Sequence, residues 1–185
     1  MFAFNEKLET EIELDGTIYP LQLAFDNVMN VLELLGDVHL SDLEKVQVGL
    51  HRLLGVIPEL EVDALVRLFN AIVEHFIQGT QKEEDVDLNG DPMPVGARTA
   101  VYDLKHDGAI IFASFKQAYG IDLVAEQGKL DWRLFKVYLR ELPDETRFKQ
   151  VVGIRMQKLP TGKHMAKERE RIQKLKRIYA LPEGG

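Results

Sequence analysis

Apolar residues recur at helical spacing through the first half of the chain, and this pattern constrains the fold more than any other feature of the sequence. It runs through residues 25–35, 43–54 and 61–78. A glycine, which readily ends a helix, follows each segment: Gly36, Gly55 and Gly79. Three helices of similar length joined by short connections form a small bundle. The sequence therefore predicts a mainly α protein, built as a helical bundle.

An alternating pattern precedes the first predicted helix. Residues 9–14 and 17–21 alternate apolar and polar side chains around Asp15-Gly16, a dipeptide that tolerates the positive φ of a tight turn. Pro20 lacks an amide donor, which places the second strand at an edge or an end. Two strands alone are only marginally stable, so we expect a short N-terminal β-hairpin that packs on the helices or pairs with another chain.

Four further helices are predicted in the second half. The apolar spacing places them at residues 101–119, 129–142, 145–156 and 162–179. The first of them contains Gly108, which lowers its helix propensity. Ser41 and Asp144 precede predicted helices, and their side chains are expected to cap free amide groups there.

Composition divides the chain into four parts. Residues 1–79 form a hairpin plus three-helix unit, and residues 80–97 form an acidic linker or loop. Residues 98–160 form a C-terminal helical unit, and residues 161–185 form a basic helical tail. The charge is uneven as well. Residues 155–180 hold nine Lys or Arg against two Glu, whereas residues 1–154 carry a net charge of −13. An acidic body repels nucleic acid, and a basic tail attracts it or an acidic protein surface.

No feature of the sequence points to export or to a membrane. The chain has no Cys, which excludes disulfides and thiolate metal sites and fits a reducing cytoplasm. Glu6, Lys7 and Glu9 stand where a secretory signal has its apolar core. No apolar run approaches the roughly 20 residues that span a bilayer. We therefore expect a cytoplasmic protein that does not bind membranes.

Motifs for catalysis and metal binding are missing or incomplete. Residues 85–90 match the first six positions of a calcium-binding EF-hand loop, but Gly96 stands where that loop needs a bidentate Glu. The five His are scattered without the spacing of a zinc site. The sequence has no nucleophile elbow, phosphate-binding loop or dinucleotide-binding motif. We expect no catalytic residue, metal or cofactor, and a protein that works by binding, although a site assembled only by the fold would escape this search.

The basic tail combines charge with a narrow apolar stripe. Ile172, Leu175, Ile178 and Tyr179 form this stripe on the predicted helix, and Ile172, Leu175 and Tyr179 are candidate protein-binding residues. Candidate electrostatic contacts surround them: Lys167, Arg169, Arg171, Lys174, Lys176 and Arg177. The helix either lies in a partner's groove or folds back on the acidic body of its own chain. Nucleic acid is the weaker candidate partner, because only Tyr179 is available for base stacking.

Residues 102–160 contain a set of aromatic, Gly-Ile-Asp and Leu-Pro-x-x-Thr elements. They read Tyr102-Asp103-Leu104, Ile111-Phe112-Ala113-Ser114-Phe115, Tyr119-Gly120-Ile121-Asp122-Leu123, Gly128-Lys129-Leu130-Asp131-Trp132, Phe135, Leu142-Pro143-Asp144-Glu145-Thr146-Arg147-Phe148 and Arg155. This stretch resembles a family of small tail proteins of long-tailed bacteriophages and prophages, which are encoded just upstream of the tape-measure gene. The first half of the chain resembles the family only in its general pattern.

The resemblance implies a tail assembly chaperone that works in the host bacterial cytoplasm. Such proteins coat the hydrophobic tape-measure protein, recruit tail-tube subunits and leave the finished particle. The implied partners are the tape-measure and tail-tube proteins of the same phage, and a homo-oligomer is compatible with this role. Two alternatives stay open: a structural component retained in the virion tail, and a small nucleic-acid binder that uses the basic tail.

The spacing of the motif residues gives most of them structural roles. Trp132 and Phe135 are at helical spacing and are expected in the core. Any of Phe112, Phe115, Tyr119 and Trp132 that prove to be exposed are candidate protein-binding residues, because aromatic anchors carry much of the energy of an interface.

Overall fold

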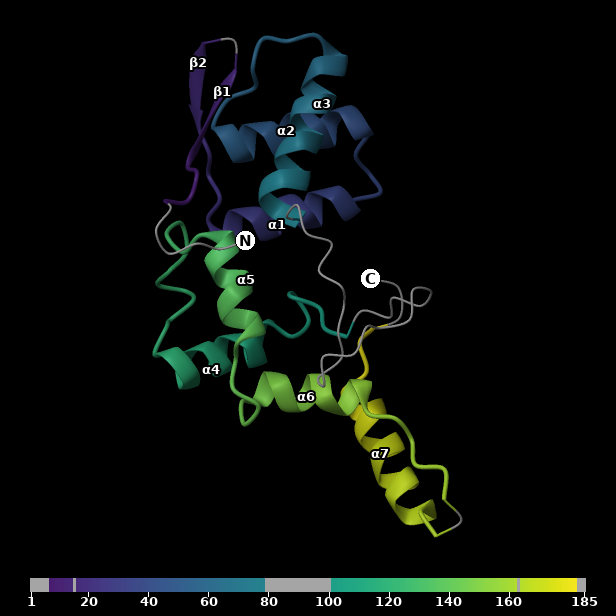
Figure 1. Cartoon of the computed structure of the whole chain (residues 1–185). Helices are drawn as coiled ribbons and strands as arrows, with labels where there is room; N and C mark the ends of the chain where they lie inside the picture. Colours follow the sequence, from purple (N-terminus) through teal and green to yellow (C-terminus); the bar gives the residue numbers. More distant parts are fainter. Residues whose placement is uncertain (1–6, 15, 79–100, 163, 183–185) are drawn as a thin grey trace. The chain divides into compact units, whose positions relative to one another are not determined.

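The computed structural model describes residues 7–14, 16–78, 101–162 and 164–182, and this part of the chain is mainly helical with one two-stranded hairpin (Figure 1). The predicted fold class is confirmed. The chain forms two compact units. Among the described residues, 7–78 and 126–136 belong to unit 1, and 101–125 and 137–182 belong to unit 2. The predicted linker, with its EF-hand-like sequence, lies outside the described residues.

The predicted hairpin is formed by β1 (Glu11–Leu14) and β2 (Thr17–Pro20) in unit 1. The register pairs Leu14 with Thr17, and Pro20 is the last residue of its strand. Residues opposite each other in an antiparallel pair point to the same side. One face therefore holds Ile12, Leu14, Thr17 and Tyr19, and the other holds Glu11, Glu13, Ile18 and Pro20.

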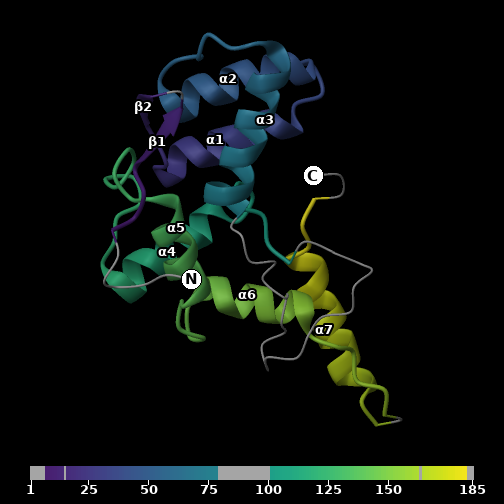
Figure 2. The same cartoon turned by 45° about the horizontal axis from the view of Figure 1, so that its top comes forward.

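Three helices form the body of unit 1, as the apolar spacing predicts. They are α1 (Phe25–Gly36), α2 (Asp42–Leu54) and α3 (Val62–Ile72), and Figures 1 and 2 show them packed together with the hairpin beside them. Residues at the predicted apolar positions are buried, among them Val28, Leu50 and Phe69. Burial of these apolar faces is what holds the three short helices together.

The predicted cap at Ser41 is confirmed. Its hydroxyl oxygen accepts a hydrogen bond from the Glu44 amide at 3.4 Å, and the Glu44 carboxylate accepts one from the Ser41 amide at 2.8 Å. This reciprocal pair is a capping box, which satisfies amide groups that the helix leaves free. The hydrogen bonds from the Ser41 hydroxyl and amide hold the pKa of Glu44 below its ordinary value.

The third predicted helix changes character at its end. The α-helix stops at Ile72, and η1 (Val73–Gln78) continues it as a π-helical turn. The carbonyl of Ile77 lies among the last four of this helix, which have no helical partner. It accepts hydrogen bonds from Trp132 Nε1 at 2.9 Å and from Lys136 Nζ at 2.8 Å.

A segment from the second half of the sequence completes unit 1. Residues 126–136 form an isolated antiparallel bridge between Asp131 and Ala24, and the Trp132 amide donates to the Leu23 carbonyl at 2.7 Å. The ring of Phe135 stacks on Phe25 with centroids 5.0 Å apart. Trp132 and Phe135 are 5% and 2% exposed, so their predicted place in the core is confirmed.

Helices α2 and α3 meet closely at Gly49. A Cβ atom on Gly49 would lie 2.4 Å from Cε2 of Phe69, whose side chain is buried. We expect Gly49→Ala to lower the free energy of unfolding by about 1–3 kcal/mol in urea titrations, because overpacking strains a full core. Gly36→Ala is the control, since no described atom lies within 4 Å of its Cβ position. Equal losses for the two variants would contradict this account.

Unit 2 contains α4 (Gly108–Tyr119), the second half of α5 (Trp132–Arg140), α6 (Arg147–Met156) and α7 (Ala166–Ile178). Helix α4 packs on α6, and α6 packs on α7. The amide of Phe148, in the first turn of α6, donates to the hydroxyl of buried Ser114 on α4 at 3.1 Å. This hydrogen bond satisfies the buried hydroxyl of Ser114 and joins the start of α6 to α4.

Three predicted details of this half are wrong. The helix expected from residue 101 begins only at Gly108, because residues 103–107 form a turn in which the Asp107 carboxylate accepts from the Asp103 amide at 3.1 Å. The helix expected from residue 129 begins at Trp132, because the chain there bridges to Ala24. Asp144 does not cap α6: Thr146 holds the cap position, and its hydroxyl donates to the Pro143 carbonyl at 2.7 Å.

A buried ion pair lies at the centre of unit 2. The Arg155 guanidinium binds both carboxylate oxygens of Asp107, at 2.6 and 2.8 Å, and the two side chains are 9% and 3% exposed. Arg155 also donates to the carbonyls of Val101 and Tyr179, at 3.1 and 2.6 Å. The Arg155 side chain thus contacts the first described residue of unit 2, the N-terminal end of α4 and the C-terminal end of α7.

In the parts of the chain that the structure describes, no helix has both the length and the apolar character needed to cross a membrane.

Candidate protein-binding surfaces

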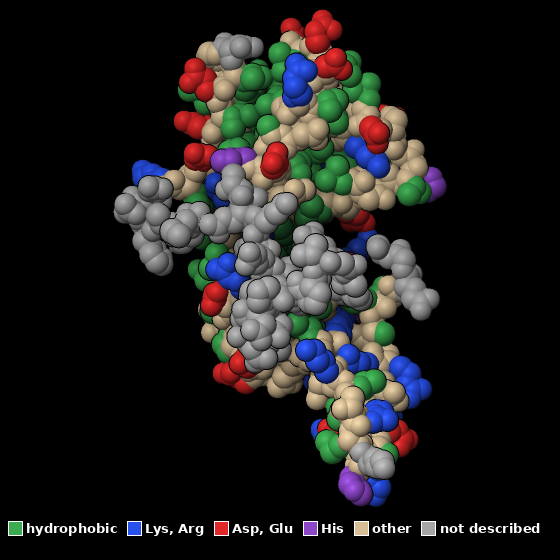
Figure 3. All heavy atoms as spheres, turned by 45° about the vertical axis from the view of Figure 1, so that its right-hand side comes forward, with side chains coloured by type: hydrophobic (Ala, Val, Ile, Leu, Met, Phe, Trp, Pro, Cys, Tyr) green, Lys and Arg blue, Asp and Glu red, His purple; other side chains and the backbone are tan. Residues whose placement is uncertain are grey.

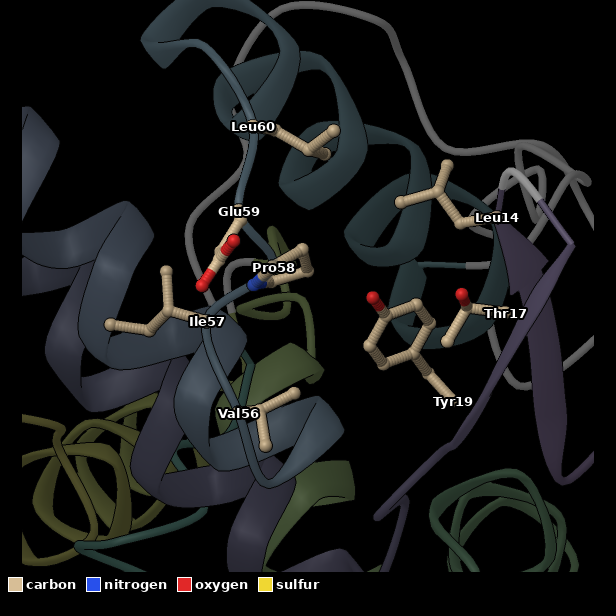
Figure 4. A pocket seen from close by; sticks show the side chains of 8 residues that line it. All are labelled: Leu14, Thr17, Tyr19, Val56, Ile57, Pro58, Glu59 and Leu60. Carbon is tan, nitrogen blue, oxygen red and sulfur yellow. The ribbon is translucent and has the colours of Figure 1, made fainter.

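A cleft of about 320 Å³ lies in unit 1 between the hairpin and the connection from α2 to α3. Figure 4 shows the side chains of Leu14, Thr17 and Tyr19 facing Pro58 and Leu60 across it. The full lining is Leu14, Thr17, Tyr19, Val56, Ile57, Pro58, Glu59 and Leu60. Six of the eight lining residues are aliphatic or aromatic, and Glu59 is the one charged residue of the lining.

The local sequence explains why one wall of this cleft is exposed. Gly55 ends α2 with a φ of 78°, and buried Pro58 anchors the connection that follows. Val56 and Ile57 lie between these two residues and are 48% and 44% exposed. Two exposed branched apolar side chains beside a cleft indicate a surface that contacts another molecule.

Acidic residues follow this wall in the sequence. Glu59, Glu61 and Asp63 follow each other at alternate positions, and all three are exposed. No Lys or Arg lines the cleft among the described residues. We use the name acid-bordered cleft for the cleft lining together with Glu61 and Asp63. Such a surface favours an apolar segment that carries positive charge.

Helix α7 of unit 2 has a basic outer face. Ile172 is 3% exposed and packs toward α6, so the side chains on the opposite side face solvent. That outer face carries Lys167, Arg171, Lys174 and Arg177, which are three or four residues apart and therefore share one side of the helix. Figure 3 shows blue Lys and Arg side chains gathered over α7. Ile178 lies beside them and is 60% exposed.

Hydrogen bonds and a ring contact join the inner face of α7 to other parts of unit 2. Lys176 Nζ donates to the Arg155 carbonyl at 2.8 Å, and Arg169 Nε donates to the Pro160 carbonyl at 3.0 Å. The Arg147 guanidinium lies over the Tyr179 ring, 5.0 Å from its centroid. The helix therefore packs on α6 of its own chain.

Among the described residues, the two units differ in charge. The described residues of unit 1 include 14 Asp or Glu against 7 Lys or Arg, whereas those of unit 2 include 13 Lys or Arg against 8 Asp or Glu. The helix α6 on which α7 packs is itself basic, with Arg147, Lys149 and Arg155 and no acid. The tail thus packs on a basic neighbour within unit 2, not on an acidic body.

Helix α4 carries the candidate aromatic residues in two environments. Phe115 is fully buried, whereas Phe112 and Tyr119 lie half-buried on one flank of the helix. The Tyr119 hydroxyl donates to the Tyr138 carbonyl at 3.1 Å. Burial, with smaller effects of Glu141 and Tyr138, raises the pKa of Tyr119, so the hydroxyl stays neutral. Ala109 and Ala113 beside them are exposed, and Val124 is 65% exposed.

The remaining candidate residues also differ in how far they are buried. Trp132 and Ile172 are buried and serve the core of their units, whereas Leu175 and Tyr179 are half-buried. Sequence reasoning missed Tyr19, Val56 and Ile57, because apolar residues are assigned to a core unless something marks them as exposed. The sequence does contain a sign that Val56 and Ile57 are exposed. They lie between Gly55 and Pro58, which leaves no room for a helix or strand that would bury them.

Within the described ranges, no three His, Asp or Glu side chains are grouped as metal ligands. Besides the acid-bordered cleft, the structure shows a groove between α6 and α7 lined by Gln150, Gly153, Ile154, Gln157, Glu168, Arg171, Ile172 and Leu175.

The fold defines a small, mainly helical protein of two units, with exposed apolar side chains in both and a basic helix in the second. The chain belongs to the Bacteriophage Gp15 protein family, whose model matches residues 4–181. This match confirms that the chain belongs to a bacteriophage protein family, which is the coarser part of what the resemblance of residues 102–160 implied. No curated protein and no solved structure matches the chain.

Proposed function

We propose that this bacteriophage protein is a tail assembly chaperone, which binds the tape-measure protein and tail-tube subunits while the tail is built. The observation that carries the proposal is the exposed apolar face of α4 in a phage-family protein. This face combines the half-buried aromatics Phe112 and Tyr119 with exposed Ala109 and Ala113. Small residues let a client helix approach closely, and the flanking aromatic rings supply anchors.

The proposed role requires binding and release, not chemistry. A chaperone must hold apolar segments of a client strongly enough to keep them from aggregating, and a face of modest size does this reversibly. Lys116 lies on the same face, three residues after Ala113 and three before Tyr119, and its charge pairs with Asp122 at 3.4 Å. The resemblance of residues 102–160 to tail proteins encoded beside the tape-measure gene supports the same role. We accordingly expect no enzymatic activity.

Co-expression of this chain with the tape-measure protein of its phage tests the proposal. We expect the client to become soluble and to co-purify with this chain. Ala113→Asp adds a carboxylate to the α4 face, and we expect it to reduce the co-purified client about tenfold or more, because removing a carboxylate from water against an apolar client costs free energy.

Ala71→Asp is the matched control, because it makes the same substitution at an exposed position of α3 in unit 1. It should leave the yield of the complex unchanged. A client that is equally insoluble with and without the wild-type chain would reject the chaperone role. A complex that forms with both variants alike would keep the role and reject the α4 face.

A further inference from the structure

The two units of this chain present surfaces that complement each other. The acid-bordered cleft of unit 1 offers apolar walls and three exposed acids, and the outer face of α7 in unit 2 offers basic side chains next to an exposed Ile178. Charge complementarity of this kind selects partners and speeds their encounter. Both members of the pair belong to every copy of the protein.

The C-terminal end of α7 carries basic side chains, whereas the lining of the cleft has none. Lys174 and Ile178 are one helical turn apart on the outer face, with Arg177 next to Ile178. The structure gives Lys174 and Arg177 no ion pair with any described residue, so their charges are available. Ile178 is 60% exposed and is the apolar side chain of this face.

The cleft has a matching arrangement. Val56 and Ile57 expose apolar surface, and Glu59 and Glu61 follow within a few residues. An isoleucine that enters between Tyr19 and Val56 would remove apolar area from water on both sides, at roughly 25 cal/mol per Å². Two lysine or arginine side chains beside it would meet the two glutamates at the border.

We propose that the acid-bordered cleft of one copy receives the C-terminal end of α7 of a second copy, so that copies of this protein associate head to tail. Because the two contacting surfaces differ, a pair of associated copies still has one free cleft and one free α7. Such a heterologous interface builds rings or open chains. The α4 face belongs to neither of the two contacting surfaces.

The proposal does not depend on the chaperone role, and it is tested on the full chain alone. We expect the molar mass, measured by light scattering after size exclusion, to rise with protein concentration at about 0.1 M salt. At about 1 M salt, where the Debye length falls from about 10 to about 3 Å, association should weaken at least tenfold.

Two charge-reversed variants locate the contact. Variant A carries Lys174→Glu and Arg177→Glu, and variant B carries Glu59→Lys and Glu61→Lys. Each variant alone should be monomeric, because its cleft and its α7 then carry the same sign of charge. An equimolar mixture of A and B should associate again, because the α7 of each fits the cleft of the other.

A variant with Glu74→Lys and Lys158→Glu, two exposed residues outside both surfaces, is the control and should associate like the wild type. Thermal unfolding monitored by circular dichroism shows whether A and B remain folded. A wild-type chain that stays monomeric at about 0.1 M salt at all concentrations would overturn the proposal, and so would folded variants A and B that associate like the wild type. A mixture of A and B that remains monomeric would overturn it as well.

Discussion

Replacing Arg155 by Met should lower the free energy of unfolding by about 3–5 kcal/mol, because the substitution leaves the Asp107 carboxylate buried without its cation. The variant also loses the hydrogen bonds to the carbonyls of Val101 and Tyr179. Arg155→Lys keeps the charge but cannot bind both carboxylate oxygens in the same way, and a smaller loss is expected. Urea unfolding followed by circular dichroism measures these differences.

The double variant Arg155→Met with Asp107→Asn separates the charge from the packing. Removing both charges should recover part of the stability lost in Arg155→Met, since no uncompensated ion is then buried. If the double variant is as unstable as the sum of the two single variants, the two residues do not act as a pair and the account of this site is wrong.

The same ion pair predicts how the stability of the protein responds to acid. Burial alone raises the pKa of Asp107, but hydrogen bonds from Arg155 and from the Asp103 amide, with the Arg155 charge, outweigh it and hold the pKa below its ordinary value. A lowered pKa in the folded state stabilises above the unfolded value of about 3.9, and that contribution is lost as the pH falls. The difference between wild type and Arg155→Met should therefore be largest near neutral pH and should shrink below about pH 4.

Replacing Trp132 by Ala should lower the free energy of unfolding by about 3–5 kcal/mol. The ring is 5% exposed, stacks on Phe135 with centroids 5.6 Å apart, and donates its Nε1 proton to the Ile77 carbonyl. The cavity left by Ala would lie between residues 126–136 and η1, where residues far apart in the sequence meet.

Trp132→Phe is the informative comparison. It keeps an aromatic ring in place and removes the indole donor, while Lys136 Nζ continues to donate to the Ile77 carbonyl at 2.8 Å. We expect a loss of about 1 kcal/mol, the usual net contribution of one hydrogen bond. Urea unfolding by circular dichroism suits all three proteins, because Trp132 is the only Trp of the chain and its fluorescence disappears with it. A loss for Trp132→Phe as large as for Trp132→Ala would show that packing of the ring contributes little.

Much of unit 1 could be predicted from the sequence because its determinants are local. The apolar spacing of residues 25–35 and 43–54, the Ser41 cap and the alternation around Asp15-Gly16 act over a few residues, and they place α1, α2 and the hairpin within a residue or two. The same local reasoning was wrong about the start of α4. It counted Val101 and Leu104 as helical, while contacts from distant residues hold the chain before Gly108 in a turn.

Long-range contacts account for most of what the sequence did not reveal. Arg155 meets Asp107 across 48 positions, and Trp132 meets the Ile77 carbonyl across 55. Periodicity carries no information about such pairs. The candidate surfaces were hard to predict for a related reason: a pattern shows that Phe115 and Phe112 are apolar, but only the fold decides that the first is buried and the second half-buried.

We propose that this bacteriophage protein acts on the tape-measure protein during tail assembly and then leaves. Quantitative mass spectrometry of infected cells tests it most directly, by measuring the ratio of this chain to the tape-measure protein in complexes captured before lysis and in purified particles. The account predicts a complex containing several copies of this chain per tape-measure protein in the cells and none of this chain in the particles. A fixed ratio in the purified particles, with no complex in the cells, would contradict the chaperone role and identify the protein as a structural component of the tail.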